Sequence, residues 1–309
     1  MNKWFGFSKK AIPLIVLLAA LSVVVGVFFL RPPVLLVSDF SFRQIYGSQR
    51  FSMAVIHNSL SLFRRVIPVS VSEFAGPDVI SLIVSQAFSS PHAVIFPKRY
   101  VDAARMYAAE HPDVPVIVIW GRNFLPQSVL HGSNIIFVRT DSAADMLIAG
   151  QAAAALVPKE EKSVLLFTDG TLQVSYQQAF EEGLRFNGME NPPIFLEAFL
   201  DHGSYAEIGS VVVSGPAFRF IERNLDIPIV LFSWIDPVMT PHSVRMIFND
   251  SPLALTVDAV RAISHGSREI FLPSQVIALS ERMETRQDGR ALAQLAALRS
   301  ASQENIENF

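Results

Sequence analysis

Short, uniformly apolar segments alternate with longer helix-like segments along nearly the whole chain, and this alternation constrains the fold more than any other feature. The apolar segments are rich in Val, Ile, Leu and Phe and end in turn residues. Because they are apolar throughout rather than at every second position, they are typical of strands buried on both faces of a parallel sheet. We therefore predict strands over residues 34–39, 66–71, 93–96, 116–120, 135–138, 163–167, 194–198, 211–213, 227–232, 244–248 and 271–278.

The intervening segments predict helices, and the alternation runs through two successive series. Helices are expected over residues 43–63, 77–88, 100–110, 141–157, 174–187, 216–224, 252–264 and 288–300. Two such series predict an α/β protein with two doubly wound parallel-sheet lobes. We expect residues 34–140 and about 251–275 in the first lobe, and 141–250 and about 276–309 in the second. Hinges are expected near 139–142, 249–252 and 273–275.

The N-terminal region has a different composition from the rest. Residues 11–30 carry no charge, with Lys9 and Lys10 before them and Arg31 after them. As a helix they would be about 30 Å long, the thickness of the hydrocarbon core of a bilayer. We predict that residues 1–33 form a cytoplasmic tip, a transmembrane helix and a Pro spacer, with the body on the periplasmic or extracytoplasmic side of the inner membrane. A cleaved signal, which would leave the body periplasmic, is the alternative.

The composition excludes several classes of function. Four of the 25 basic residues and none of the 28 acidic ones fall in residues 1–33, which leaves the remainder with a formal charge of −7. Such a body is not expected to bind nucleic acid. The chain has no Cys, which excludes disulfides and thiolate chemistry. None of the common catalytic or phosphate-binding motifs occurs, and the seven His residues have no metal-ligand spacing. We expect no enzyme activity, cofactor or metal site.

Three segments resemble the type I periplasmic-binding-protein fold of ABC-transporter substrate-binding receptors. They are HPDVPVIVIW (111–120), TDSAADMLIAGQAAAALV (140–157) and SVLLFTDGTLQVSYQQAFEEGLRFNG (163–188). The resemblance covers roughly residues 34–280 and is closest to the basic-membrane-protein group of nucleoside receptors. It implies a receptor that binds a small molecule between two lobes. No Asn follows Phe40 or Phe42, which departs from the pattern of the nucleoside receptors.

Ligands of open α/β sheets bind outside the carboxyl ends of the strands. Aromatic and polar side chains at these ends suit a small polar ligand that carries a ring. We predict ligand-binding roles for Asp39, Phe40, Phe42, Phe96, Trp120, Arg139, Asp141, Asp169, Trp234, Asp236 and Asn249. Arg122, Ser214 and Asp250 are further candidates. Trp120, Trp234 and Asp236 are expected to face one cleft.

These observations predict an extracytoplasmic solute-binding protein that captures a small polar ligand and delivers it to an ABC permease. Two alternatives remain open. One is a membrane-tethered ligand-sensing or assembly module of the same fold with no transport role. The other is a hydrolase or transferase built on a Rossmann-like sheet.

Overall fold

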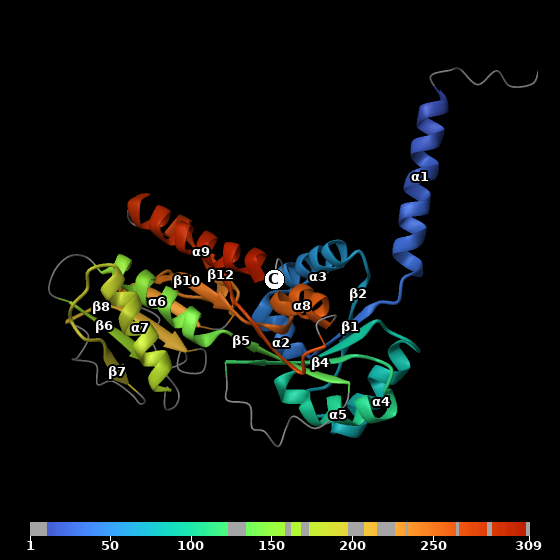
Figure 1. Cartoon of the computed structure of the whole chain (residues 1–309), viewed down its shortest axis with the longest axis horizontal. Coiled ribbons are helices and arrows are strands. Elements are labelled where there is room, and N and C mark those ends of the chain that lie inside the picture. The colour runs from blue at the N-terminus through green and yellow to red at the C-terminus, as the bar shows by residue number, and fades with distance from the viewer. Residues whose placement is uncertain are drawn as a thin grey trace, which may run out of the picture.

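The computed structural model describes residues 11–122, 134–157, 162–167, 173–196, 207–214, 226–232, 234–263, 266–282 and 286–306. Figure 1 shows an elongated body of two α/β lobes, from which one helix projects. The elements of the first half are α1 (Ala11–Leu30), β1 (Val34–Ser38), α2 (Phe40–Tyr46), α3 (Ser48–Leu62), β2 (Val66–Ser70), α4 (Pro77–Ala87), β3 (Ala93–Pro97), η1 (Lys98–Tyr100), α5 (Val101–Glu110), β4 (Val116–Gly121), β5 (Ile135–Thr140) and α6 (Ser142–Leu156). Those of the second half are β6 (Ser163–Phe167), α7 (Val174–Phe186), β7 (Ile194–Leu196), β8 (Ile208–Ser214), β9 (Ile229–Phe232), η5 (Pro237–Met239), β10 (Val244–Asn249), α8 (Pro252–Ala262), β11 (Glu269–Leu272), β12 (Gln275–Ala278), η7 (Ser280–Arg282) and α9 (Arg286–Ile306).

The strands form two six-stranded sheets. Their orders are β11-β5-β4-β3-β1-β2 in the first lobe and β12-β10-β9-β8-β6-β7 in the second. All neighbours pair in parallel except β12, which is antiparallel to β10. The predicted α/β class with two parallel-sheet lobes is thereby confirmed. The chain passes from one sheet to the other three times: after β5, after β10 and between β11 and β12.

Two of the predicted elements are wrong in their extent. The strand expected over 271–278 is two strands in different sheets, because Pro273 has no N–H to continue the ladder and the chain crosses between lobes there. The helix expected over 43–63 is α2 and α3, which are separated at Gly47. Gly47 has φ 83°, and a Cβ at this position would collide with the carboxylate of Asp236. The helix expected over 216–224 lies outside the described residues.

Successive residues of each strand point to opposite faces, and helices cover both faces of the first sheet. Helices α3 and α8 lie on one face and α4 and α5 on the other (Figure 1). Leu36, Ile117 and Ile119 pack in the cluster with α3 and α8, whereas Val118 and Trp120 pack in the cluster with α4 and α5. A third cluster lies between the second sheet and helices α6, α7 and α9. The cluster under α3 and α8 continues into the second sheet, so that one apolar core joins the lobes.

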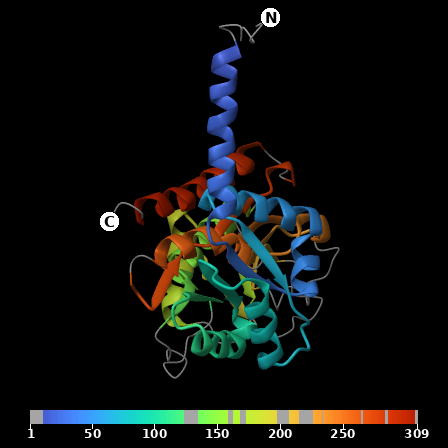
Figure 2. The same ribbon diagram turned by 90° about the vertical axis from the view of Figure 1, so that its right-hand side faces the viewer.

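Helix α1 stands away from the body in both views (Figures 1 and 2). Its lower end is held against the first lobe, where the rings of Phe28 and Phe63 lie 5.8 Å apart and the Arg31 guanidinium lies 5.0 Å from the centre of the Phe63 ring. The side chains that the structure describes begin at Val16, and most of those from Val16 to Leu30 are exposed. In the described part of the chain, no helix is long and apolar enough to cross a membrane. The transmembrane helix expected over 11–30 is therefore not confirmed.

Helices α6 and α7 pack closely because two glycines lie at their contact. A Cβ added to Gly150 would overlap the backbone oxygen of Phe180, and one added to Gly183 would overlap that of Leu147. Neither obstacle is a flexible side chain, so the helices would have to separate to accept a methyl group.

We expect the substitution Gly183→Ala to lower the free energy of unfolding by about 1–3 kcal/mol, the usual cost of overpacking a core. Helix propensity alone predicts the opposite sign, a gain of about 1 kcal/mol. Urea denaturation followed by circular dichroism measures the difference. Glu182→Ala, at an exposed position of the same helix, is the control and should change stability by less than about 0.5 kcal/mol. A stabilised Gly183→Ala variant would show that the close helix contact is wrong.

Candidate functional site

Asp39 lies at the carboxyl end of β1 and is almost completely buried. Its carboxylate caps α2 by accepting a hydrogen bond from the Phe42 N–H at 2.8 Å. It also accepts a hydrogen bond from the hydroxyl of Tyr100 at 2.9 Å and pairs with Arg99 at 3.1 Å. Arg99 and Tyr100 belong to η1, which follows β3. Because β1 and β3 are parallel neighbours, both ends reach the same edge of the sheet.

A second carboxylate completes this group, which we call the Asp39 cluster: Asp39, Glu73, Arg99 and Tyr100. Glu73 follows β2, pairs with Arg99 at 3.5 Å and accepts a hydrogen bond from the Ser41 hydroxyl at 2.7 Å. Arg99 therefore bridges two carboxylates, and 43% of its side chain is exposed. Burial, and then the hydrogen bond to Asp39, raise the pKa of Tyr100, so its hydroxyl remains a donor at neutral pH.

Phe40 and Phe42 follow Asp39 but lie in different environments. Phe40, in the first turn of α2, has 69% of its surface exposed beside the Asp39 cluster. Phe42 packs inward against Tyr46 and Phe51, with ring centres 5.8 and 6.0 Å away. Of the two, only Phe40 offers a free aromatic face.

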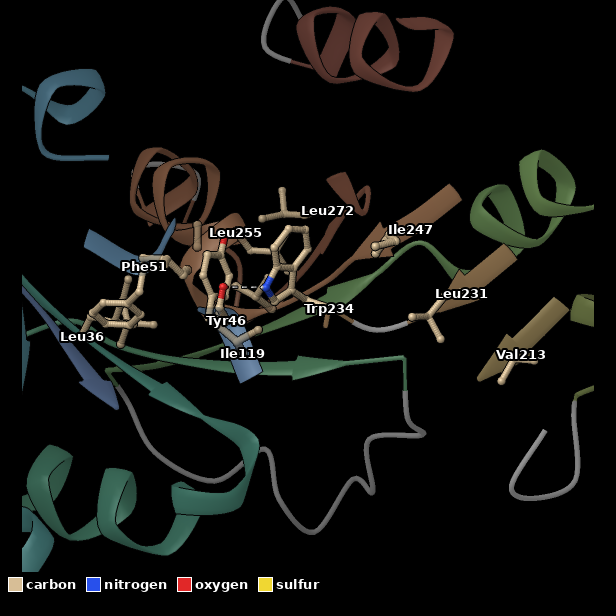
Figure 3. Close-up of a cluster of buried hydrophobic side chains, with 14 of the residues drawn as sticks. Leu36, Tyr46, Phe51, Ile119, Val213, Leu231, Trp234, Ile247, Leu255 and Leu272 are labelled. Carbon is tan, nitrogen blue, oxygen red and sulfur yellow. Dashed lines mark hydrogen bonds between the residues drawn. The ribbon is translucent and has the colours of Figure 1, made fainter. Parts of the chain in front are cut away.

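The far end of α2 contacts the second lobe. The rings of Tyr46 and Trp234 lie 4.9 Å apart, and the Trp234 indole donates a hydrogen bond of 3.4 Å to the Tyr46 carbonyl (Figure 3). The Asp236 N–H donates to the Ile45 carbonyl at 2.8 Å, and the Asp236 carboxylate pairs with Arg50 at 3.1 Å. We call this contact between α2–α3 and the segment after β9 the interlobe junction.

Arg122 follows β4 and contacts groups at all three places where the chain crosses between lobes. Its guanidinium pairs with Asp145 of α6 at 3.7 Å and with Asp250 after β10 at 3.4 Å. It donates a hydrogen bond of 3.0 Å to the hydroxyl of Ser274, between β11 and β12, and its Cζ lies 4.4 Å from the ring centre of Phe232. The Ser274 hydroxyl in turn donates to Asp145, which is fully buried.

Asn249 lies at the second crossing and is fully buried. Its side-chain oxygen accepts from the Ser251 N–H at 3.1 Å, and its side-chain nitrogen donates to Gln275 at 3.3 Å. Tyr46 hydrogen-bonds to the side chains of Asn249 and Ser251, while burial raises its pKa. Asn249 therefore links the second and third crossings to Tyr46 at the interlobe junction.

The other predicted site residues that the structure describes make different contacts. Phe96 is fully buried in the core, and Trp120 lies edge-on to Phe137 beneath the ammonium group of Lys98. Arg139 pairs with Glu269 at 2.8 Å. Asp141 caps α6 through the Ala144 N–H. Asp169 lies outside the described residues.

The structure does not bring the two tryptophans together. Trp120 belongs to the cluster under α4 and α5 and Trp234 to the one under α3 and α8, with 7% and 6% of their surfaces exposed. The strand alternation decides this, since Trp120 points to the face opposite Ile119. Ligand contacts for either indole remain a prediction.

Several residues of these groups were not predicted from the sequence. Glu73 and Arg99 follow strands β2 and β3, so the rule that selected Asp39 applies to them as well. Tyr46, Arg50 and Asp145 lie within helices, where no local pattern marks them. Within the described ranges, no three His, Asp or Glu side chains are placed to hold a metal ion.

Comparison with solved structures shows the same two-lobed arrangement in other proteins. A periplasmic ribose ABC transporter from Conexibacter woesei has a TM-score of 0.53 at 17% identity, covering 87% of this chain and 97% of that one. The fold is that of the type I periplasmic binding proteins. An ABC transporter periplasmic solute-binding protein from Actinobacillus succinogenes with bound D-allose also shares the type I fold, with a TM-score of 0.51 at 11% identity over 82% of this chain and 99% of that one.

A solved structure that is not described as a transport protein has a similar fold. A transcriptional activator of the comK gene from Bacillus halodurans has a TM-score of 0.58 at 12% identity, covering 87% of this chain and 96% of that one. No protein-family model and no curated protein sequence matches the chain. At these identities the likeness is one of fold, and the nucleoside-receptor subgroup is not confirmed.

We expect Arg122→Met to lower the free energy of unfolding by about 2–4 kcal/mol, because it leaves the buried charge of Asp145 without its guanidinium partner. The double variant Arg122→Met/Asp145→Asn should be at least about 1 kcal/mol more stable than Arg122→Met alone. The effects of substituting two residues in contact are not additive. Arg185→Met is the control. It breaks an exposed ion pair with Glu181 and should cost less than about 1 kcal/mol. If Arg122→Met and Arg185→Met lower the free energy of unfolding equally in urea denaturation, Arg122 does not stabilise the buried charge of Asp145.

Proposed function

We propose that the chain is an extracytoplasmic solute-binding receptor, which captures a small polar ligand between its lobes for ABC-type uptake. The observation that carries the proposal is the Asp39 cluster beside the exposed ring of Phe40, at the edge where strands β1, β2 and β3 end. In open parallel sheets this edge is the usual place for a ligand.

The chemistry of the Asp39 cluster suits a hydroxyl-rich ring such as a monosaccharide. The carboxylates of Asp39 and Glu73 accept hydrogen bonds from hydroxyl groups, and the guanidinium of Arg99 donates them. The ring of Phe40 offers an apolar face to the C–H groups of a sugar at low entropic cost. The D-allose bound to the Actinobacillus neighbour and the description of the Conexibacter neighbour as a ribose ABC transporter support this class of ligand.

Capture in this proposal is a closing of the two lobes around the three crossings. The hinge segments are 139–142, 249–252 and 273–275, and Arg122 contacts a residue at or beside each crossing. Asp169 stays a proposed ligand residue. In the same proposal, the partner of the receptor is an ABC permease.

We expect the purified full-length chain to bind a monosaccharide such as D-ribose or D-allose in isothermal titration calorimetry, and Asp39→Asn to weaken binding about 10- to 100-fold. The loss corresponds to one charge-assisted hydrogen bond, worth about 1.5–3 kcal/mol. Asn retains the helix-capping ability of Asp, so α2 should stay folded.

Asp113→Asn is the matched control, because Asp113 is exposed and lies before β4, whereas the Asp39 cluster lies at the carboxyl ends of the strands. It should leave sugar affinity unchanged. If no monosaccharide binds while a nucleoside or an amino acid does, the ligand class is wrong. If Asp39→Asn binds sugar as the parent chain does, the Asp39 cluster is not the site.

A second candidate is a membrane-tethered sensing or assembly module of the same fold without a transport role. Two observations favour it. Residues 11–30 form one uncharged helix whose described side chains are mostly exposed, an arrangement that is costly in water. A type I neighbour of this chain is described as a transcriptional activator rather than as a transport protein.

The tether predicts that the protein stays in the membrane fraction after a carbonate wash and keeps its original N-terminus. A mature N-terminus beyond about residue 25 would instead indicate a cleaved signal.

Uptake of the bound sugar after deletion of the gene separates the two candidates. Lost uptake favours the receptor, and unchanged uptake favours the sensing module.

A further inference from the structure

A pocket of about 580 Å³ lies between α3 and α8 of the first lobe. Its walls are residues that recur at helical spacing on the facing sides of the two helices. The helices are tied together at the pocket by Asn58, whose side chain donates a hydrogen bond of 2.7 Å to the Leu253 carbonyl. The Asp39 cluster does not contribute to it.

The pocket combines apolar walls with opposite charges. Met53 of α3 and Leu253 and Val257 of α8 provide the apolar surface. Asp258 and Arg261 also line it, and they lie three residues apart on α8. A carboxylate and a guanidinium at this spacing match a ligand that carries an ammonium group and a carboxylate close together. Neither group has to be unpaired, because a carboxylate has about four acceptor sites and a guanidinium has several N–H donors, so that each can bind a ligand beside an existing partner.

Two residues that line the pocket connect it to the second lobe. Tyr46 lines the pocket, and its ring lies 4.9 Å from that of Trp234 at the interlobe junction. Gln275 lines the pocket as well; it belongs to β12 of the second sheet, and its side-chain oxygen accepts a hydrogen bond from Asn249 of the same sheet. A molecule bound here would therefore touch Tyr46, which contacts Trp234 across the junction, and Gln275 of the second lobe.

We propose that the α3–α8 pocket binds a free α-amino acid with an apolar side chain, and that its occupancy is transmitted to the interlobe junction through Tyr46 and Trp234. The ammonium group pairs with Asp258, the carboxylate pairs with Arg261, and the side chain packs against Met53, Leu253 and Val257. This site is separate from the sugar site proposed above and does not depend on it.

Isothermal titration calorimetry of the full-length chain with L-leucine and L-methionine tests the binding. The matched ligands are 3-methylbutylamine and 4-methylpentanoate, which each keep the apolar group of leucine and one of its charges. We expect the amino acids to bind at least tenfold more tightly than either analogue. Asp258→Asn and Arg261→Gln should each weaken leucine binding at least tenfold.

Asp102→Asn and Arg105→Gln are the matched controls, because Asp102 and Arg105 form an acid–base pair of the same spacing on α5. They should leave leucine binding unchanged. Binding that is absent, that is unaffected by the α8 variants, or that is equally tight for an analogue would overturn the assignment. Asp39→Asn should leave leucine affinity intact, which separates this test from that of the sugar site.

Tryptophan fluorescence tests the transmission. Saturating leucine should shift the emission of the parent chain and of Trp120→Phe, because Trp120 lies under α4 and α5. The shift should disappear in Trp234→Phe, with leucine affinity retained. A shift that persists in Trp234→Phe and disappears in Trp120→Phe would overturn the route through Tyr46.

Discussion

The chain passes three times between its two sheets, and one guanidinium makes contact at each passage. Arg122 meets Asp145 just after the first crossing, Asp250 at the second and Ser274 at the third. Asp145 is fully buried, and both this guanidinium and the Ser274 hydroxyl stabilise its charge. This network links the two lobes where the chain crosses between them.

Apolar packing strengthens the same connection. The cluster under α3 and α8 runs from Leu36 in the first sheet to Val213 and Leu231 in the second, with the Tyr46 and Trp234 rings between them (Figure 3). Polar groups are concentrated at the opposite end of α2, where it is capped by Asp39. A short helix therefore has one end in the junction and the other in the polar cluster. This arrangement gives a ligand at the Asp39 cluster a short path to the lobe contact.

The positions of most strands were predictable because buried parallel strands have a characteristic composition, although the single strand expected over 271–278 is two strands in different sheets. The predicted strand ends also located the residues that cap helices or line crossings, such as Asp39, Asp141 and Asn249. For Phe96 and Trp120, ligand contact stays a prediction. Both lie at strand ends, but the pleat turns them into the core under α4 and α5. A strand end identifies an edge of the sheet, whereas the face that a side chain occupies depends on register.

The sequence by itself determined that this chain folds into two α/β lobes, because strand burial and helix spacing are local patterns. Only the tertiary structure decided which side chains meet. Arg99 joins Asp39 to Glu73, Tyr46 reaches Trp234 across 188 positions, and α3 and α8 enclose a pocket. Such contacts arise from the packing of distant elements, for which a linear sequence carries no periodic signal.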